Sequence, residues 1–295
     1  MIKIVVSAAL LFLVKNSVIA QAGFDAARVD CGLIENNEIT EASGIAASRK
    51  NANILWTHND SGDKNRIFAI NTKGEHRGTF LLVGAENRDW EDIAVGPGPN
   101  KKDSYIYIGD IGDNNAQKYT KYIYRVPEPE IAKGRPPVLH QISEVETFAF
   151  QYPDGNRDAE ALLVHPMTKD IYIISKREEK VRVYCAPWPQ AFTKKNFHSI
   201  TIVEFITEIE LSWVTAGDIS PDGKSLLIKT DDAVFLWPLD PESSIEYALQ
   251  LVPRTMPYVV EPLGEAICWS ADGTGYFTLS EEQDAIPARL YYYKN

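Results

Sequence analysis

Short runs of β-branched and aromatic residues alternate with turn residues along most of the chain. Five of these runs begin with small apolar residues that stand beside an acid, at 41–46, 89–94, 158–163, 215–220 and 264–268. Each is followed by a turn rich in Gly, Pro, Asn or Asp and then by a second apolar run, as in 54–57 after the turn at 49–53. This pattern is typical of β-hairpins. Each acidic segment is therefore predicted to open an antiparallel unit.

A third and a fourth run complete most units. The third runs are 67–70, 122–126, 181–184, 234–237 and 290–293, and the more polar fourth runs are 76–82, 143–150, 199–206 and 246–252. The fifth unit has no fourth run, but residues 27–34 have strand character and precede the first unit. Circular propellers close their ring in this way. We predict an all-β fold with a single β-propeller of five blades, closed by an N-terminal strand; the alternative is a sixth blade between 127 and 157.

The first twenty residues have the pattern of a secretory signal peptide. Lys3 precedes an apolar run at 4–14, and small residues stand before Gln21. The run is too short for a permanent membrane anchor. We therefore expect residues 1–20 to be a signal peptide, residues 21–295 to form the propeller domain, and the mature protein to be secreted and extracellular. The sequence has no second apolar segment of this kind, so we expect no membrane anchor.

Charge and cysteine content exclude several classes of protein. The formal net charge is -11, which argues against nucleic acid as a partner and suits an extracellular protein or one that collects cations. The three cysteines, Cys31, Cys185 and Cys268, are far apart and have no zinc-site spacing. An odd count leaves at least one thiol unpaired, and we expect no essential disulfide.

The repeat predicts where acids would meet. In a propeller, the first strand of each blade lines the central channel, and the loop between the second and third strands shares a face with the channel mouth. The acids expected at this mouth are Glu41, Glu91 or Asp92, Glu160, Asp218 and Glu265. The surrounding loops at 58–63, 109–115, 175–179, 229–232 and 280–284 are the most polar of the chain. Carboxylates, amides and hydroxyls should therefore converge on one face.

Carboxylates packed around one axis repel each other, and a bound cation relieves that repulsion. Ligands that offer only oxygen atoms favour calcium over zinc or copper. The candidate metal ligands are Glu91, Glu160, Glu265, Asn59, Asp60, Asp110, Asp113 and Asn114. The alternative is that these acids pair with Lys or Arg, or end their strands in solvent.

Lysines beside this ring suggest a second kind of ligand. Lys176 and Lys229 fall at similar places on neighbouring blades and could hold a small anion; they could equally balance the acidic ring. The predicted ligand-binding residues are Lys176, Lys229, Asp218 and Glu281. His58 could act as a general base, although packing against Trp56 or Trp90 is the favoured interpretation. Asn59 also begins a glycosylation sequon.

Four motifs carry a family resemblance: 56–62 (WTHNDSG), 89–94 (DWEDIA), 109–114 (GDIGDN) and 158–163 (DAEALL). Together they resemble a group of secreted, largely uncharacterised bacterial β-propeller proteins, over about residues 40 to 280. This resemblance implies export and a propeller fold but no reaction. More distantly, the blade plan and Glu41-Ala-Ser43 are similar to calcium-dependent apyrases, five-bladed propellers that hold calcium with channel acids.

Two functions remain open from the sequence. The first is a secreted calcium-binding propeller that acts as an extracellular binding or matrix protein with a ligand site at the channel mouth. The second is a metal-dependent hydrolase of a phosphoester or lactone at the same site. Its catalytic candidates are Glu91, Glu160 and His58.

Overall fold

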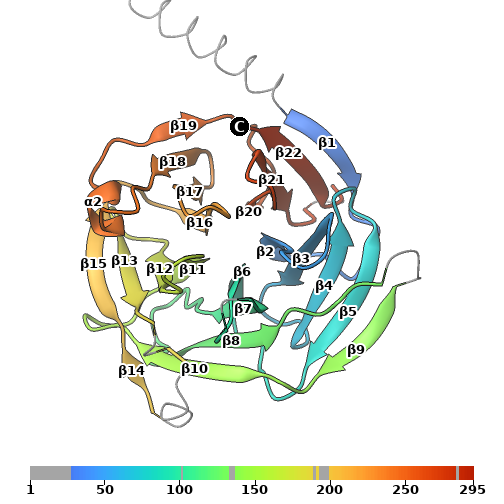
Figure 1. Ribbon diagram of the computed structural model, residues 1–295, viewed down its shortest axis with the longest axis horizontal. Coiled ribbons are helices and arrows are strands. Elements are labelled where there is room, and N and C mark those ends of the chain that lie inside the picture. Colours follow the sequence, from blue (N-terminus) through green and yellow to red (C-terminus); the bar gives the residue numbers. More distant parts are fainter. Residues whose placement is uncertain (1–27, 101, 133–136, 189–190, 193–198, 284–285) are drawn as a thin grey trace, which may run out of the picture.

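Five β-sheets stand around a common axis, with the first strand of each sheet nearest the centre (Figure 1). The computed structural model describes residues 28–100, 102–132, 137–188, 191–192, 199–283 and 286–295. The predicted all-β fold and its five blades are confirmed. The predicted signal peptide lies outside the described residues.

Each blade has four antiparallel strands. Blade 1 consists of β2 (Ala42–Ala47), β3 (Ile54–Asn59), β4 (Arg66–Asn71) and β5 (His76–Leu82). Blade 2 consists of β6 (Trp90–Pro97), β7 (Ser104–Asp110), β8 (Lys121–Pro127) and β10 (Glu146–Gln151). Blade 3 consists of β11 (Ala159–Val164), β12 (Ile171–Ser175), β13 (Val181–Ala186) and β15 (Glu204–Ile209). Blade 4 consists of β16 (Val214–Ile219), β17 (Ser225–Thr230), β18 (Val234–Pro238) and β19 (Arg254–Met256).

Blade 5 is built from both ends of the described chain. It combines β20 (Gly264–Trp269), β21 (Gly275–Ser280) and β22 (Arg289–Lys294) with the N-terminal strand β1 (Arg28–Leu33). β1 pairs antiparallel with β22, with Arg28 opposite Tyr293 and Leu33 opposite Arg289. The predicted closure of the ring by an N-terminal strand is thereby confirmed.

Two blades carry an additional strand on their outer edge. β9 (Val138–Ile142) runs parallel to β5 of blade 1, and β14 (Thr201–Ile202) runs parallel to β10 of blade 2. The described residues between 127 and 157 therefore extend blade 1 and complete blade 2. They do not form the sixth blade that was the alternative.

The fourth run predicted at 246–252 is wrong. The chain forms a short helix there, α2 (Ile245–Leu249), and the fourth strand of blade 4 is β19. The Ser244 side chain caps the helix by accepting a hydrogen bond from the Tyr247 backbone N–H. Ala248 and Leu249 are the buried residues of this helix. Among the described residues, no helix is long and apolar enough to cross a membrane.

Apolar side chains fill the spaces between neighbouring blades. Trp90 is fully buried in a cluster that joins residues of blades 1 and 2, such as Trp56, Ile67 and Ile106. Its ring meets the His58 ring edge-on, at 5.7 Å between centroids. A buried tryptophan contributes a large apolar area to this contact. Trp90 therefore fixes the position of the first strand of blade 2, from which the next residue projects toward the channel mouth.

A buried carboxylate connects three blades at the channel centre. Asp92 Oδ2 accepts hydrogen bonds from the backbone N–H groups of Leu162, at 2.9 Å, and Gly217, at 3.5 Å. Its Oδ1 accepts from Ile93 N at 2.8 Å. Asp92 is fully buried, and burial raises its pKa well above the usual value. Blades 2, 3 and 4 are thus joined through one side chain.

Replacing Asp92 with alanine should therefore destabilise the whole ring. Three buried backbone N–H groups would lose an acceptor, at a cost of about 1–3 kcal/mol for each unpaired group. Relief of the burial of the Asp92 carboxylate offsets part of this cost. We therefore expect the free energy of unfolding, measured by urea denaturation, to fall by roughly 2–5 kcal/mol. Glu242→Ala, at an exposed position, is the control and should change it by less than about 0.5 kcal/mol. An unchanged midpoint for Asp92→Ala would contradict this role.

Candidate functional site

The first strand of every blade contains a β-bulge at the same place. The register shifts between Ala42 and Gly44 in blade 1 and at the matching position in each of the other four blades. A bulge inserts one unpaired residue and re-aims its side chain. The bulged residues are Ser43, Glu91, Glu160, Thr215 and Glu265. The counterpart of Glu91 in blade 4 is therefore Thr215.

The carboxyl group of Glu91 is buried and hydrogen-bonds to the carboxyl group of Glu160. It is 4% exposed, and the Ser43 hydroxyl lies 2.6 Å from its backbone oxygen but 3.3 Å from its Oε2. A hydroxyl has one hydrogen to donate, and the shorter contact takes it. Gly112 packs so closely that a Cβ atom there would lie 1.9 Å from Glu91 Oε1. Burial raises the pKa of Glu91 well above the usual value, and the nearby Glu160 and Asp60 raise it further.

Glu160 lies beside Glu91 and is paired with a lysine. Lys176 Nζ is 3.1 Å from Glu160 Oε1 and 3.8 Å from Glu265 Oε2. Burial nevertheless raises the pKa of Glu160 to about 8, because the favourable charge of Lys176 only partly offsets desolvation. The same two carboxylates raise the pKa of Lys176, although burial acts against it. This is the contact expected from the alternative interpretation, in which Lys176 balances the acidic ring and does not hold an anion.

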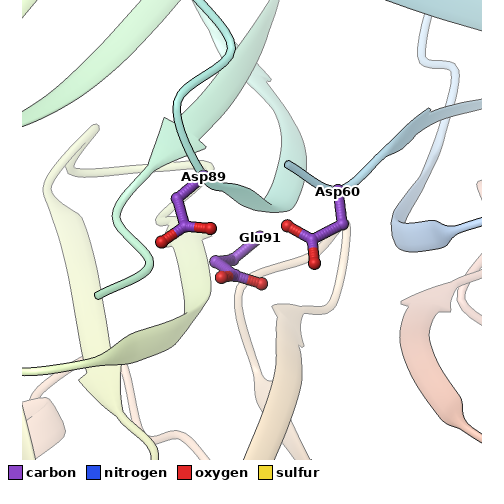
Figure 2. Close-up of side chains that lie close together, drawn as sticks. All are labelled: Asp60, Asp89 and Glu91. Atoms are coloured by element: carbon purple, nitrogen blue, oxygen red, sulfur yellow. The ribbon is translucent and has the colours of Figure 1, made fainter. Parts of the chain in front are cut away.

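Two groups of carboxylates meet at Glu91. Oxygen atoms of Asp60, Asp89 and Glu91 lie within 4.8 Å of one another, and so do those of Glu91, Asp158 and Glu160. Figure 2 shows the first group, in which the carboxylates of Asp60 and Asp89 point toward Glu91 from either side. Asp89 and Asp158 were not predicted as ligands. Each stands two residues before a bulged glutamate, so the repeated Asp-x-Glu spacing was a signal for both.

The neighbouring cations pair with the acids around Glu91. Lys118 pairs with Asp89, Arg177 Nε lies 2.5 Å from Asp158 Oδ2, and Lys176 contacts Glu160. The charges that act on Asp60 come from Asp89, Glu41 and Glu265; together with burial they raise its pKa to about 6. No cation of this group pairs with Glu91.

Four predicted ligands have protein partners in the surrounding loops. Asp110 accepts from Arg88 Nε at 2.6 Å and from Asp89 N at 3.1 Å. Asn114 Oδ1 accepts a hydrogen bond from Arg177. Through these contacts, Asp110 fixes the backbone at Asp89, and Asn114 helps to hold the guanidinium that pairs with Asp158.

Asp113 and Asn59 support their own loops in the same way. Asp113 accepts from the backbone N–H groups of Gln117 and Lys118, and its carboxylate pairs with the buried Lys121 at 3.1 Å. Asn59 is 3% exposed, and its amide donates to Glu38 O at 2.7 Å and to an oxygen of Asp63. A glycan on Asn59 would displace both bonds, so the folded structure does not favour modification of this sequon.

The remaining predicted ligand-binding residues are dispersed. Burial raises the pKa of Glu281 to about 7, with smaller contributions from Glu265 and Asp60. Asp218 lies toward the other end of the channel, where it accepts from Trp269 N at 2.9 Å and is close to Arg49. Lys229 is fully buried in β17 and donates to Thr215 Oγ1, Thr230 O and Gly264 O. Burial lowers its pKa to about 8.

His58 occupies a structural position. Its ring is fully buried against Trp90, and Nδ1 lies 3.0 Å from Asn59 O. Burial lowers the pKa of His58 to about 4, so the ring is neutral at physiological pH. These contacts agree with the favoured interpretation of His58 as a packing residue.

The buried acids predict how stability depends on pH in the absence of divalent cations. A folded-state pKa above the unfolded value makes the folded protein bind protons more tightly, so that its stability falls as pH rises through that window. The raised pKa of Glu91 and the value of about 8 for Glu160 place the fall between about pH 5 and 8. Urea denaturation in EDTA at several pH values measures it.

The double variant Glu91→Gln, Glu160→Gln removes both titrating groups and should reduce this slope, whereas Glu242→Gln should leave it unchanged. A wild-type stability that rises steadily from pH 5 to 8 in EDTA would contradict the raised pKa values.

A scan of protein-family models and a search of curated proteins give no match to this chain. The five-bladed fold agrees with both resemblances suggested by the motifs. Beyond the fold, the comparisons lend no support to either the bacterial propeller family or the apyrases.

Proposed function

We propose that this protein is a secreted propeller that binds a divalent cation, calcium being the one its donors favour, and acts as an extracellular binding protein. The observation that carries the proposal is the position of Glu91, a buried carboxylate among Glu160, Asp60 and Asp89 whose neighbouring cations pair with other acids. Oxygen-only donors from carboxylates suit calcium. The extracellular location rests on the sequence of residues 1–20.

The proposed metal ligands are Glu91, Glu160, Asp60 and Asp89, with Asp158 beside them. Two buried carboxylates this close cannot both be charged without compensation, so they either share a proton or bind a cation. Calcium would displace the proton, and its affinity should therefore rise with pH. Lys118 and Arg177 would hold Asp89 and Asp158 in place.

The hydrolase remains the second candidate because of one observation. A pKa of about 8 lets Glu160 exchange a proton near neutral pH, as a general acid or base must. Against it, Glu91 and Glu160 are both 4% exposed, which leaves a compact ion better access than an organic substrate. A panel of phosphoester and lactone substrates, tested with calcium present, separates the two; turnover that Glu160→Gln abolishes would favour the enzyme.

Calorimetric titration of EDTA-treated protein with calcium tests the site. We expect one site with a dissociation constant on the order of 10⁻⁶ to 10⁻³ M. Glu91→Gln together with Glu160→Gln removes two ligands and should weaken binding by about 100-fold or more. Glu242→Gln, at an exposed position away from the acids, should bind like the wild type. Equal calcium affinity in the double variant would exclude this site.

Replacing Lys176 should strengthen calcium binding, unlike the replacement of the glutamates. Its ammonium group lies 3.1 Å from Glu160 and competes with a metal ion for that carboxylate. Replacing it with methionine keeps the apolar stem but removes the charge, so calcium affinity should rise about tenfold. Lys180→Met is the matched control, because Lys180 pairs with the exposed Glu210. Weaker binding in Lys176→Met would mean that the lysine supports the site instead.

A further inference from the structure

A groove runs along the outermost strand of blade 3, away from the acidic mouth. It lies between β15 and the segment at 249–253 that follows α2, and it has a volume of about 850 Å³. Most of β15 lines one wall, from Phe205 to Ile209, and the buried Trp237 lies beneath it. Because the groove follows β15 from Phe205 to Ile209, its shape fits an extended segment of chain.

The walls of this groove expose apolar side chains. Val252 is 93% exposed and Phe205 is 46% exposed. Exposed apolar side chains clustered beside a cavity mark interaction sites more often than isolated ones do. Of the described strands, β13 alone pairs with β15, so no described strand bonds the other edge of β15. The Gln250 side chain donates to Thr207 Oγ1 at 2.6 Å across the groove and would have to turn aside when a segment binds.

Blades 1 and 2 show what such an edge accepts in this fold. In each, a further strand of the same chain lies parallel to the fourth strand: β9 beside β5, and β14 beside β10. In blade 3 no further described strand lies beside the fourth strand, β15 (Figure 1). The groove runs along this strand. A segment from another molecule could add to β15 as β9 adds to β5.

The charge of the rim indicates the chemistry of that segment. Glu208, Glu210 and Glu246 line the groove, and Lys180 is the cation among its lining residues. Lys180 pairs with Glu210, and Arg182 pairs with Glu208 from the adjacent strand. The net charge of -11 also opposes a second copy of this chain as occupant.

We propose that this groove binds an extended segment of a partner protein in which apolar residues alternate with lysine or arginine. The segment adds as a strand parallel to β15, in the mode of β-augmentation, where backbone hydrogen bonds supply affinity and side-chain pockets supply specificity. Its apolar side chains contact Phe205 and Val252, and its cations face Glu246 and compete with Lys180 for Glu210. This proposal does not depend on the metal site.

The test uses two synthetic peptides and the full-length protein. The first, acetyl-Lys-Val-Lys-Val-Lys-Val-amide, should bind, and the second, with Glu in place of Lys, should bind at least tenfold more weakly. Calorimetry measures the affinity of each peptide. Hydrogen exchange locates the lysine peptide, which should slow exchange of backbone amides within β15. No binding of the lysine peptide at millimolar concentration, or binding without protection of β15, would overturn the proposal.

Variants at exposed positions keep the test independent of folding. Val252→Ser should weaken binding of the lysine peptide about tenfold, whereas Leu139→Ser, on the exposed face of β9, should not. Glu210→Lys with Glu246→Lys should also weaken it at least tenfold. Glu130→Lys with Glu144→Lys makes the same change in net charge elsewhere and should have little effect. If both charge variants lose the same affinity for the lysine peptide, the attraction is non-specific and the groove is not the binding site.

Discussion

The burial of acidic side chains at the axis is the constraint on which this structure depends. Five first strands converge there, and the bulge in each one projects a single side chain toward the channel mouth. Three of those side chains are glutamates, and two of them, Glu91 and Glu160, are almost excluded from water. Removing carboxylates from water disfavours their charged form. The site must therefore take up protons or cations.

Other residues at the channel mouth compensate the charge of these buried acids. Asp92 uses its buried carboxylate to satisfy backbone groups of three blades and so belongs to the framework. Lys118, Arg177 and Lys176 each balance one acid next to Glu91. Glu91 itself sits where Gly112 leaves room for its carboxylate. The framework thus compensates most of the buried charge and leaves Glu91 and Asp60 for a ligand.

The blade plan could be read from the sequence because turn residues and apolar runs recur in each blade. The plan also placed Lys176 beside the acidic ring, where pairing with the acids was the alternative to holding an anion. Hydrogen bonds inside loops do not follow from spacing, so the protein partners of Asn59, Asp110 and Asp113 were not foreseen. Asp218 lies three residues beyond the bulged Thr215, about 10 Å along a strand, which places it deeper in the channel. The helix α2 is too short for its period to be distinguished from a strand.

Anomalous diffraction from a crystal grown with calcium and then exchanged into terbium would show directly whether a cation lies between Glu91 and Glu160. Terbium binds oxygen ligands much as calcium does, and its anomalous scattering is strong enough to locate it in the crystal. We predict a peak there, with carboxylate oxygens at about 2.3–2.6 Å. A mouth without a peak, in which the two carboxyl groups share a proton by direct contact, would contradict this prediction.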